Sequence, residues 1–336
     1  MPSTRPSTLQ DVADLSGVSR GTASRALTGG GRVSAETRSR VLAAASSLRY
    51  STNSGARNLR RARAGSIGLW LPGGMNFMEY YMNFAVGVVE STKDRELTVS
   101  LIPADFPAAK AGGLHVDGFV MTDVISGDEL ARAILETGRP VVVSELVPPG
   151  MPEPTAIVAG DHSTAMNRLL NRLRTGGATS IAVIRPPVNQ MWVRIAAGAA
   201  ADWATDNHLP VTFVDLMGVP SAEELHQMIQ ELQATHPDVD AIVCLPEGLG
   251  VGILSTLREL GHSVPDDIQL LSYTDSPSLA IVQPPISALD LRAKDAGMRA
   301  GELLMSLIEG ADGAEHTVES FELIYRERSS TRPIRK

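Results

Sequence analysis

The sequence predicts a small all-α head followed by an α/β body that forms two parallel-sheet lobes. Three observations support this prediction. Residues 1–64 hold eleven arginines and three acidic residues, a formal charge of +8, whereas residues 65–336 carry −16. The head places apolar residues at helical spacing. The body instead alternates near-continuous apolar runs with amphipathic segments, the pattern of parallel sheets covered by helices on both faces.

The head is expected to contain three short helices. Thr8 and Asp11 form a capping-box pattern at the start of the first helix. Gly17 supplies a permissive turn, Ser19 caps a second helix, and a third helix begins after Ser34. The residues expected to face inward are Leu9, Val12 and Ala13 in the first helix, Ala23, Ala26 and Leu27 in the second, and Val41, Leu42, Ala45 and Leu48 in the third.

Two short helices joined by a glycine turn and supported by a third are typical of helix-turn-helix DNA-binding domains. Three-helix packing also occurs in proteins that bind no DNA. The excess of arginine favours DNA, since it is the charge pattern of a module that binds a polyanion. A solvated basic tail is the alternative explanation of the charge.

The residues of the head resemble the signature of the lactose-repressor (LacI) family. The resemblance rests on residues 8–27, on residues 33–38, and on residues 48–50 followed by Asn53. It implies that the second helix, residues 19–27, lies in the major groove of operator DNA.

The resemblance also assigns contacts with DNA. Arg20 and Arg25 would each donate two hydrogen bonds to a guanine and so read the base sequence. Family members usually carry a base-reading side chain where this chain has Gly21, so Arg20 is expected to carry more of the specificity. The positions implied to contact phosphates are Thr8, Ser19, Thr22, Ser24, Thr37, Tyr50 and Asn53. Helix capping is the alternative role of the serine and threonine side chains.

Residues 53–61 resemble the hinge helix of the family, which folds when two copies meet over a minor groove. Leu59 occupies the position of the leucine that wedges into the central base step, and Ala56 would touch the groove wall. Gly55 weakens such a helix, and an arginine-rich linker without groove insertion is the alternative. The residues implied to neutralise phosphates are Arg57, Arg60 and Arg61.

Strands and helices are expected to alternate in the body. Two rounds of about five strands indicate two Rossmann-like lobes with a cleft between them, and ligands bind such sheets at the carboxyl ends of the strands. Residues 108–113 are expected to form a loop, because the chain between Ile102 and Asp117 is too short for the helix that the LacI family, which the head resembles, usually has there. The expected strands are 67–71, 97–102, 118–121, 141–144, 155–158, 180–184, 211–216, 241–245 and 268–272. The expected helices are 81–92, 164–174, 193–208, 222–235 and 250–260.

The body resembles the effector-binding core of the same family, which is itself similar to periplasmic sugar-binding proteins. The residues that carry the resemblance are Asp117 and Gly118, Asp161, 179–182, Arg194 with Gly198, 264–268, 289–291 with Gly297, and 325–333. The ligand-contact positions that it implies are Tyr80, Tyr81, Asp161, Arg194, Glu247 and Asp275. Arg194 with Asp275 suits the vicinal diol of a sugar, because a guanidinium donates hydrogen bonds and a carboxylate accepts them. Trp192, beside Arg194, is a further stacking candidate.

The body departs from the family pattern at several of these positions. Pro246 and Glu247 stand where the family has Asn and Asp, and Thr274 replaces the first Asp of a pair whose second member is Asp275. Structural roles are the alternatives for some candidates, with Asp161 as a helix cap, Tyr80 as a core residue and Asp275 as a turn cap.

The sequence therefore predicts a cytoplasmic, nucleoid-associated repressor that binds a pseudo-palindromic operator as a homodimer. An effector, expected to be a carbohydrate, would bind in the interlobe cleft and alter the grip on DNA. The expected domains are 1–49 for the helix-turn-helix domain, 50–64 for the hinge and 65–336 for the core. Within the core, one lobe is expected over about 65–161 and 292–320, and the other over about 162–291 and 321–336.

Other functions compete with this prediction. A purine or a phosphorylated metabolite acting as a co-repressor is the alternative effector, and a solute-binding protein of transport is the alternative class. The absence of an apolar signal region and of an apolar run of about eighteen residues argues against secretion and membrane insertion. No dinucleotide-binding, Walker or nucleophile-elbow motif occurs, so an enzyme is not expected. With one cysteine and no paired histidine spacing, neither a metal nor another cofactor is expected.

Overall fold

The computed structural model describes residues 7–28, 31–50, 63–73, 78–95, 97–310 and 317–334. The chain divides into two compact units, residues 1–64 and residues 65–336. Each unit has a hydrophobic core of its own. Among the helices in these described ranges, none has the length and apolar character needed to cross a membrane.

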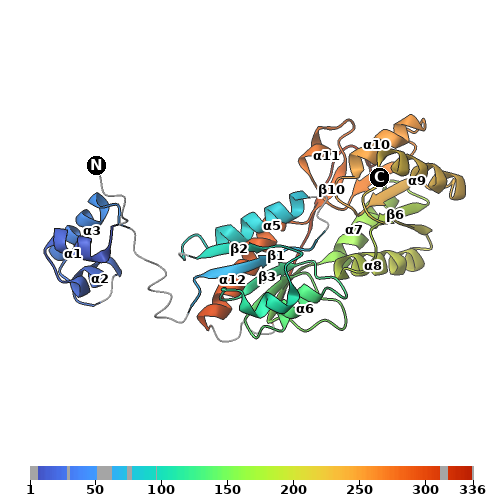
Figure 1. Cartoon of the computed structure of the whole chain (residues 1–336). Coiled ribbons are helices and arrows are strands. Elements are labelled where there is room, and N and C mark those ends of the chain that lie inside the picture. The colour runs from blue at the N-terminus through green and yellow to red at the C-terminus, as the bar shows by residue number, and fades with distance from the viewer. Residues whose placement is uncertain are drawn as a thin grey trace. The chain divides into compact units, whose positions relative to one another are not determined.

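The first unit is a bundle of three helices, shown in blue in Figure 1: α1 (Leu9–Ser16), α2 (Arg20–Thr28) and α3 (Ala35–Ser47). The prediction that Leu42 faces inward is wrong, because this side chain is 50% exposed. Leu42 follows the buried Val41 by one residue and so points about 100° away around the helix. The buried core, rich in alanine, consists of Val12, Ala13, Ala23, Ala26, Val41, Ala44 and Ala45.

Local hydrogen bonds fix the ends of these helices. The predicted capping box at α1 is present, since Thr8 Oγ1 accepts from the Asp11 amide at 3.3 Å and Asp11 Oδ2 accepts from the Thr8 amide at 2.7 Å. The residue after α1, Gly17, has φ +67°, a left-handed conformation that glycine adopts without steric cost. Ser34 begins α3 by accepting a hydrogen bond from the Thr37 amide at 3.2 Å. The predicted boundaries of the three helices are therefore confirmed to within a few residues.

The second unit contains two six-stranded sheets, with strand orders β11-β5-β4-β3-β1-β2 and β12-β10-β9-β8-β6-β7. β10 and β12 pair antiparallel, and the other strand pairs of the described chain are parallel. The first sheet consists of β1 (Ser66–Trp70), β2 (Thr98–Ile102), β3 (Phe119–Thr122), β4 (Val141–Ser144), β5 (Ala156–Gly160) and β11 (Val318–Phe321). The second consists of β6 (Ile181–Arg185), β7 (Val211–Asp215), β8 (Ala241–Cys244), β9 (Gln269–Ser272), β10 (Ser287–Asp290) and β12 (Ile324–Arg326).

Helices cover both faces of each sheet, so alternate residues of a strand enter different cores. In β3, Val120 packs in one core, whereas Phe119 and Met121 pack in another. The helices around the first sheet are α5 (Met78–Ser91), α6 (Glu129–Leu135), α12 (Ala293–Glu309) and the 3-10 helix η1 (Ala108–Gly113). Those around the second are α7 (His162–Thr175), α8 (Met191–Asn207), α9 (Ala222–Thr235), α10 (Gly250–Glu259) and α11 (Pro277–Ile281). This burial on both faces explains why the strands read as continuous apolar runs.

Two features of the body differ from the sequence-based expectation. Residues 108–113 were expected to form a loop, but they form η1, where Ala111 is buried against the sheet. A 3-10 helix can form in the short connection between β2 and β3, because it needs only a few residues. The first sheet has one strand more than expected, β11, and the second has two, β10 and β12; β11 and β12 lie at the sheet edges.

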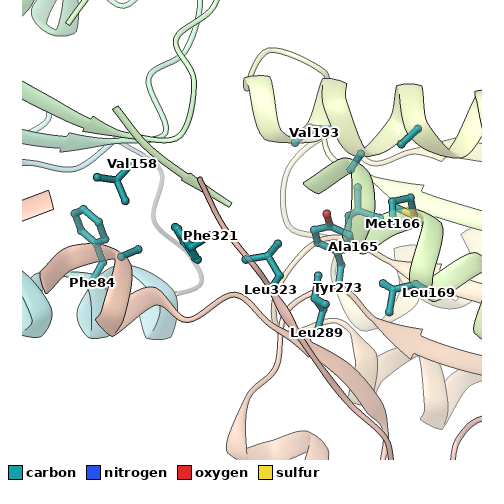
Figure 2. Close-up of a cluster of buried hydrophobic side chains, with 14 of the residues drawn as sticks. Phe84, Val158, Ala165, Met166, Leu169, Val193, Tyr273, Leu289, Phe321 and Leu323 are labelled. Carbon is teal, nitrogen blue, oxygen red and sulfur yellow. The ribbon is translucent and has the colours of Figure 1, made fainter. Parts of the chain in front are cut away.

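Short segments carry the chain from one sheet to the other, and a shared core fills the space around them. The chain crosses between β5 and α7, between β10 and α12, and between β11 and β12. Phe321 and Leu323 lie on the last crossing. Figure 2 shows Leu323 between Phe321 and Tyr273, within one cluster of buried side chains that includes residues of both lobes. The lobes are therefore joined through apolar packing as well as through the chain.

The helices α5 and α12 pack with almost no space between their backbones. A Cβ atom at Gly87 would overlap the carbonyl oxygen of Lys294, and a Cβ atom at Gly297 would overlap that of Phe84. Glycine is therefore needed at both positions for this close approach.

Candidate functional site

The beginning of α2 presents arginine side chains to solvent. Ser19 begins the helix, since its Oγ accepts a hydrogen bond from the Thr22 amide at 3.1 Å. Arg20 and Gly21 follow in the first turn, and both are exposed. Arg25 lies further along the helix and is also exposed. A helix start with amide groups directed outward and arginines beside it suits an anionic partner.

The predicted phosphate-contacting residues lie at several places in the first unit. Thr8 and Ser19 use their hydroxyl groups to cap α1 and α2. Thr37 Oγ1 accepts a hydrogen bond from Ser34 Oγ at 2.8 Å. The half-buried members of the set are Thr8, Thr22, Ser24, Thr37 and Tyr50. The predicted contacts Asn53, Ala56, Arg57, Leu59 and Arg60 lie outside the described residues.

The second unit contains a cavity of about 320 Å³ at the carboxyl ends of strands from both sheets. Its walls come from the segments after β3, β4, β6, β8 and β9 and from the first turns of α5, α7 and α8. Ligands of open α/β sheets bind at this edge, and the volume suits a small molecule. The lining residues that bear on its chemistry are Tyr80, Tyr81, Asp123, Glu145, His162, Trp192, Glu247 and Thr274.

Two acidic residues enter the cavity from neighbouring strands of the first sheet. Asp123 directly follows β3 and Glu145 directly follows β4, and these strands are paired. Both residues have positive φ angles, 50° and 73°, a conformation that non-glycine residues adopt rarely and that is concentrated at functional sites. Both side chains are buried, with Asp123 at 6% and Glu145 at 5% exposed.

Hydrogen bonds and one close contact with a histidine hold these carboxylates in place, and the Gly160 amide donates to Glu145 Oε1 at 3.2 Å. The Tyr81 hydroxyl donates to Asp123 Oδ2 at 2.8 Å. His162 Nε2 lies 3.1 Å from Glu145 Oε2, and His162 Nδ1 lies 2.9 Å from the Tyr273 hydroxyl. Because His162 begins α7 in the second lobe, its contact with Glu145 joins the two lobes inside the cavity.

Other contacts also cross between the lobes at the cavity. The Tyr80 amide donates to Glu247 Oε2 at 3.4 Å. Ile125, after β3, forms an isolated antiparallel bridge with Gln190, which precedes α8. A ligand in the cavity therefore contacts residues whose positions depend on how the two lobes are arranged.

Aromatic rings line the cavity on both sides. Tyr80 and Tyr81 of α5 meet edge to face, with ring centroids 5.4 Å apart. On the second lobe, Trp192 lines the cavity and stacks on the buried ring of Tyr273 behind it, with centroids 5.9 Å apart, and His162 lies 5.8 Å from Trp192. Such faces can stack on the apolar side of a sugar ring or on a flat heterocycle.

Burial changes the ionisation of two carboxyl groups in the cavity. Burial and the charge of Glu145 raise the pKa of Asp123 to about 7, against the opposing influence of the Tyr81 hydrogen bond. Burial and the charge of Glu79 raise the pKa of Glu247 to about 7, against the influence of the Tyr80 amide. Burial also raises the pKa of Tyr81 well above its ordinary value, so its hydroxyl remains a donor at neutral pH.

The predicted effector-binding residues divide into two groups. The structure brings Tyr80, Tyr81, Trp192 and Glu247 together in the cavity lining. Asp161, Arg194 and Asp275 are not part of that lining. Asp161 caps α7 by accepting from the Thr164 amide at 3.0 Å, the Arg194 side chain is exposed, and Asp275 lies 2.8 Å from Arg328.

Sequence reasoning missed Asp123, Glu145 and His162. A signal for the two acids was available, because each lies within two residues of the end of an apolar run that was expected to be a strand. Their position at the carboxyl ends of adjacent parallel strands could have been inferred from that order. In the described part of the chain, no group of three or more His, Cys, Asp or Glu side chains is arranged to hold a metal ion.

Comparison with known proteins agrees with both units. Residues 8–53 match the lacI family of bacterial regulatory proteins, and residues 170–331 match the periplasmic binding protein-like domain. The chain is 26% identical to the ribose operon repressor of Bacillus subtilis (strain 168), over 97% of this chain and 98% of the relative.

Solved structures show the same architecture. A complex of the transcriptional regulator CelR with cellobiose has a TM-score of 0.71 at 25% identity and covers 96% of this chain and 99% of its own. The lac repressor dimer bound to operator and the anti-inducer ONPF has a TM-score of 0.82 at 19% identity, over 98% and 100% of the two chains. With its helix-turn-helix unit and its periplasmic binding protein-like unit, the chain belongs to the lacI family of DNA-binding transcriptional regulators.

Proposed function

We propose that this protein is a transcriptional repressor that binds a pseudo-palindromic operator as a homodimer and responds to a carbohydrate in the cavity of its second unit. The observation that carries the proposal is the combination of an exposed, arginine-bearing start of α2 with a ligand-sized cavity in the same chain. The first supplies contacts with base edges and phosphates, and the second supplies a place for a regulating ligand.

The chemistry of the cavity supports a carbohydrate. Carboxylates accept hydrogen bonds from hydroxyl groups, and the rings of Tyr80, Tyr81 and Trp192 offer faces for a sugar ring. The names of the relatives include a ribose operon repressor and a complex with cellobiose. A phosphorylated metabolite is less well supported, because no arginine or lysine lines the cavity among the residues that the structure describes.

Regulation would follow from the cavity's position between the lobes. Its walls include Asp123 and Glu145 from one lobe and His162 and Glu247 from the other. A ligand that binds one arrangement of the lobes more tightly shifts the population toward that arrangement. In a dimer, such a shift changes the spacing of the two DNA-binding heads and with it the affinity for the operator.

An exposed apolar surface on the first lobe supports a dimer. Met82, Val86 and Val89 of α5 are 55%, 40% and 52% exposed and recur at helical spacing. Leu101 of the neighbouring edge strand β2 is 62% exposed. We assign this surface to a second copy of the chain, because a two-fold dimer buries the same patch on both subunits and presents two heads to a symmetric operator.

We further propose that the protein acts in the cytoplasm on the nucleoid and is not an enzyme. The relatives that it resembles are transcriptional regulators, and a regulator of this kind acts where its operator lies.

Fluorescence anisotropy with a duplex from the protein's own promoter region tests the DNA-binding part of the proposal. Arg20→Ala should weaken specific binding by about 1–3 kcal/mol, since it removes two hydrogen bonds to one base. Arg40→Ala, which removes an equal charge from the exposed part of α3, serves as the matched control and should reduce binding only slightly. Equal losses in both variants would show that α2 does not read the DNA sequence.

A thermal-shift screen of the full chain against mono- and disaccharides tests the effector. A sugar that stabilises the protein should also change the anisotropy of the operator complex, because ligand and DNA binding are linked. If no sugar stabilises the protein, the carbohydrate assignment is wrong, whatever the outcome for DNA.

A further inference from the structure

We propose that the effector carries a protonated amine: an amino sugar, held between the aromatic rings of the two lobes with its ammonium group against Asp123 and Glu247. This inference rests on the proposed function, since it specifies the chemistry of the ligand in the same cavity. It goes beyond that function because a cationic sugar needs acidic groups at the site, whereas a neutral sugar does not.

The ionisable groups of the cavity are mainly acidic, with His162 as the basic side chain among the described lining residues. Asp123, Glu145 and Glu247 line it, whereas no lysine or arginine does within the described residues. Glu145 lies 3.1 Å from His162. No lysine or arginine lies beside Asp123 or Glu247 in the cavity lining of the described chain, so a cationic ligand would supply a positive charge next to them.

Each of these two carboxylates also keeps one oxygen available. Asp123 is 6% exposed, and its Oδ2 accepts from the Tyr81 hydroxyl at 2.8 Å, while its Oδ1 has no hydrogen-bond donor within the described part of the chain. Glu247 Oε2 accepts from the Tyr80 amide at 3.4 Å, and Oε1 has no donor among those residues. Both oxygens are therefore open to a hydrogen-bond donor of a ligand. An ammonium group supplies both positive charge and three N–H donors.

The aromatic lining favours the same ligand. Tyr80, Tyr81 and Trp192 line the cavity beside the carboxylates, and the Tyr81 ring ends in the hydroxyl that donates to Asp123. The face of an aromatic ring attracts a cation as well as the apolar face of a sugar. A cavity that combines carboxylates with aromatic faces therefore suits a polyhydroxylated ring that carries an amine.

A neutral sugar would be expected to meet a balanced set of donors and acceptors. The sequence suggested such a set in Arg194 and Asp275, but neither lines the cavity. The Arg194 side chain is exposed, and the Asp275 carboxylate is already paired with Arg328 at 2.8 Å. The remaining lining adds the amides of Asn189 and Gln190, which both donate and accept, so it is the acidic character of its charged groups that favours an ammonium group.

Isothermal titration calorimetry with matched ligands tests the inference on the full-length protein. The ligands are glucosamine, galactosamine and mannosamine, each with its parent hexose and its N-acetylated form, which are neutral. At pH 7 and low salt, at least one amino sugar should bind about tenfold or more tightly than both neutral counterparts. The preference should shrink as salt is added, because the ionic contact is screened.

The dependence on pH provides an independent readout. Asp123 is faced by Glu145, His162, Tyr80 and Tyr81, and Glu247 is faced by Glu79 and by the Tyr80 amide. Burial raises the pKa of both acids to about 7, so acidification converts them to neutral groups that hold an ammonium less strongly. From pH 7 to pH 5.5, amino-sugar affinity should fall by about tenfold, and the affinity for neutral sugars should change little.

Variants identify the residues responsible. Asp123→Asn and Glu247→Gln should each reduce the preference for the amino sugar while retaining binding of the neutral form. Asp202→Asn, an equal change at an exposed position of α8, should leave the preference unaltered. Equal or tighter binding of the neutral sugars by the unchanged protein would overturn this inference and leave the proposed function in place. A panel in which no sugar binds would overturn both the carbohydrate effector and this inference.

Discussion

The buried carboxyl group of Asp123 connects the chemistry of one residue to the stability of the second unit. Its pKa is raised from the ordinary 3.8 to about 7, so the folded protein holds this proton more strongly than the unfolded chain does. The protonated Asp123 carboxyl therefore contributes to the stability of the folded protein. This contribution is fully present below pH 3.8 and is lost as the pH rises through 7. The unliganded protein should therefore be destabilised by its own cavity at alkaline pH.

The variant Asp123→Asn tests this linkage. Asparagine cannot ionise, and its carbonyl can still accept from the Tyr81 hydroxyl. Relative to the unchanged protein, the variant should gain about 2–4 kcal/mol of unfolding free energy between pH 5 and pH 8. Urea unfolding at pH 5 and at pH 8 measures the unfolding free energy of the variant and of the parent, with Asp202→Asn as the control. If the difference in unfolding free energy between variant and parent is the same at both pH values, the pKa of Asp123 is not raised by folding.

Single residues also show where sequence reasoning reached the cavity and where it did not. Tyr80, Tyr81, Trp192 and Glu247 were identified, because they occupy positions that the family resemblance marks or lie beside one. Asp123 and Glu145 were missed, although each follows a predicted strand, because the family resemblance marks neither position. Only the pairing of β3 with β4 brings them together.

At the scale of elements, the crossing of α5 over α12 depends on two glycines. Gly297→Ala would place a methyl group into the backbone of Phe84, which cannot move without separating the helices. We expect a loss of stability of about 1–3 kcal/mol or more, as for other overpacked sites. Thermal or urea unfolding of the full chain measures this loss.

A second glycine in a helix serves as the control. Gly198 lies in α8, and no atom lies within 4 Å of a Cβ atom built there. Gly198→Ala should stabilise the protein slightly, by up to about 1 kcal/mol, because alanine favours the helix. If Gly297→Ala behaves like Gly198→Ala, the two helices are not as closely packed as the structure has them.

The elements themselves were largely predictable from their apolar patterns. Strands β1 to β9 were expected from their runs of apolar residues, which in the central strands reflect burial on both faces, whereas the edge strands β2 and β7 are partly exposed. The short β11 and β12 were not, since Val318 and Glu319 are exposed or half-buried and give no such run. Their membership in the sheets is decided by distant partners, β5 and β10.

At the scale of the whole molecule, the proposed dimer predicts that the apolar surface of α5 is the interface between the two copies. Val86→Asp places a charge in the centre of the patch formed with Met82 and Val89. This change should convert a dimer into monomers and weaken operator binding, because each monomer then contacts one half-site. Sedimentation velocity and anisotropy measure the two effects.

The matched control changes valine to aspartate elsewhere on the same lobe. Val318 of β11 is 59% exposed and lies at the edge opposite β2. Val318→Asp should leave the dimer intact. A parent protein that sediments as a monomer, or a Val86→Asp variant that remains dimeric, would place the interface elsewhere or remove it.

Selection of binding sites from a random duplex library by the full-length protein tests the central claim most directly. That claim is that two copies of the arginine-rich head read a DNA sequence together. The predicted result is one enriched consensus with two-fold symmetry, whose outer bases lose their enrichment when Arg20 is replaced by Ala. Recovery of unrelated sequences, with no motif above the starting pool, would contradict the account.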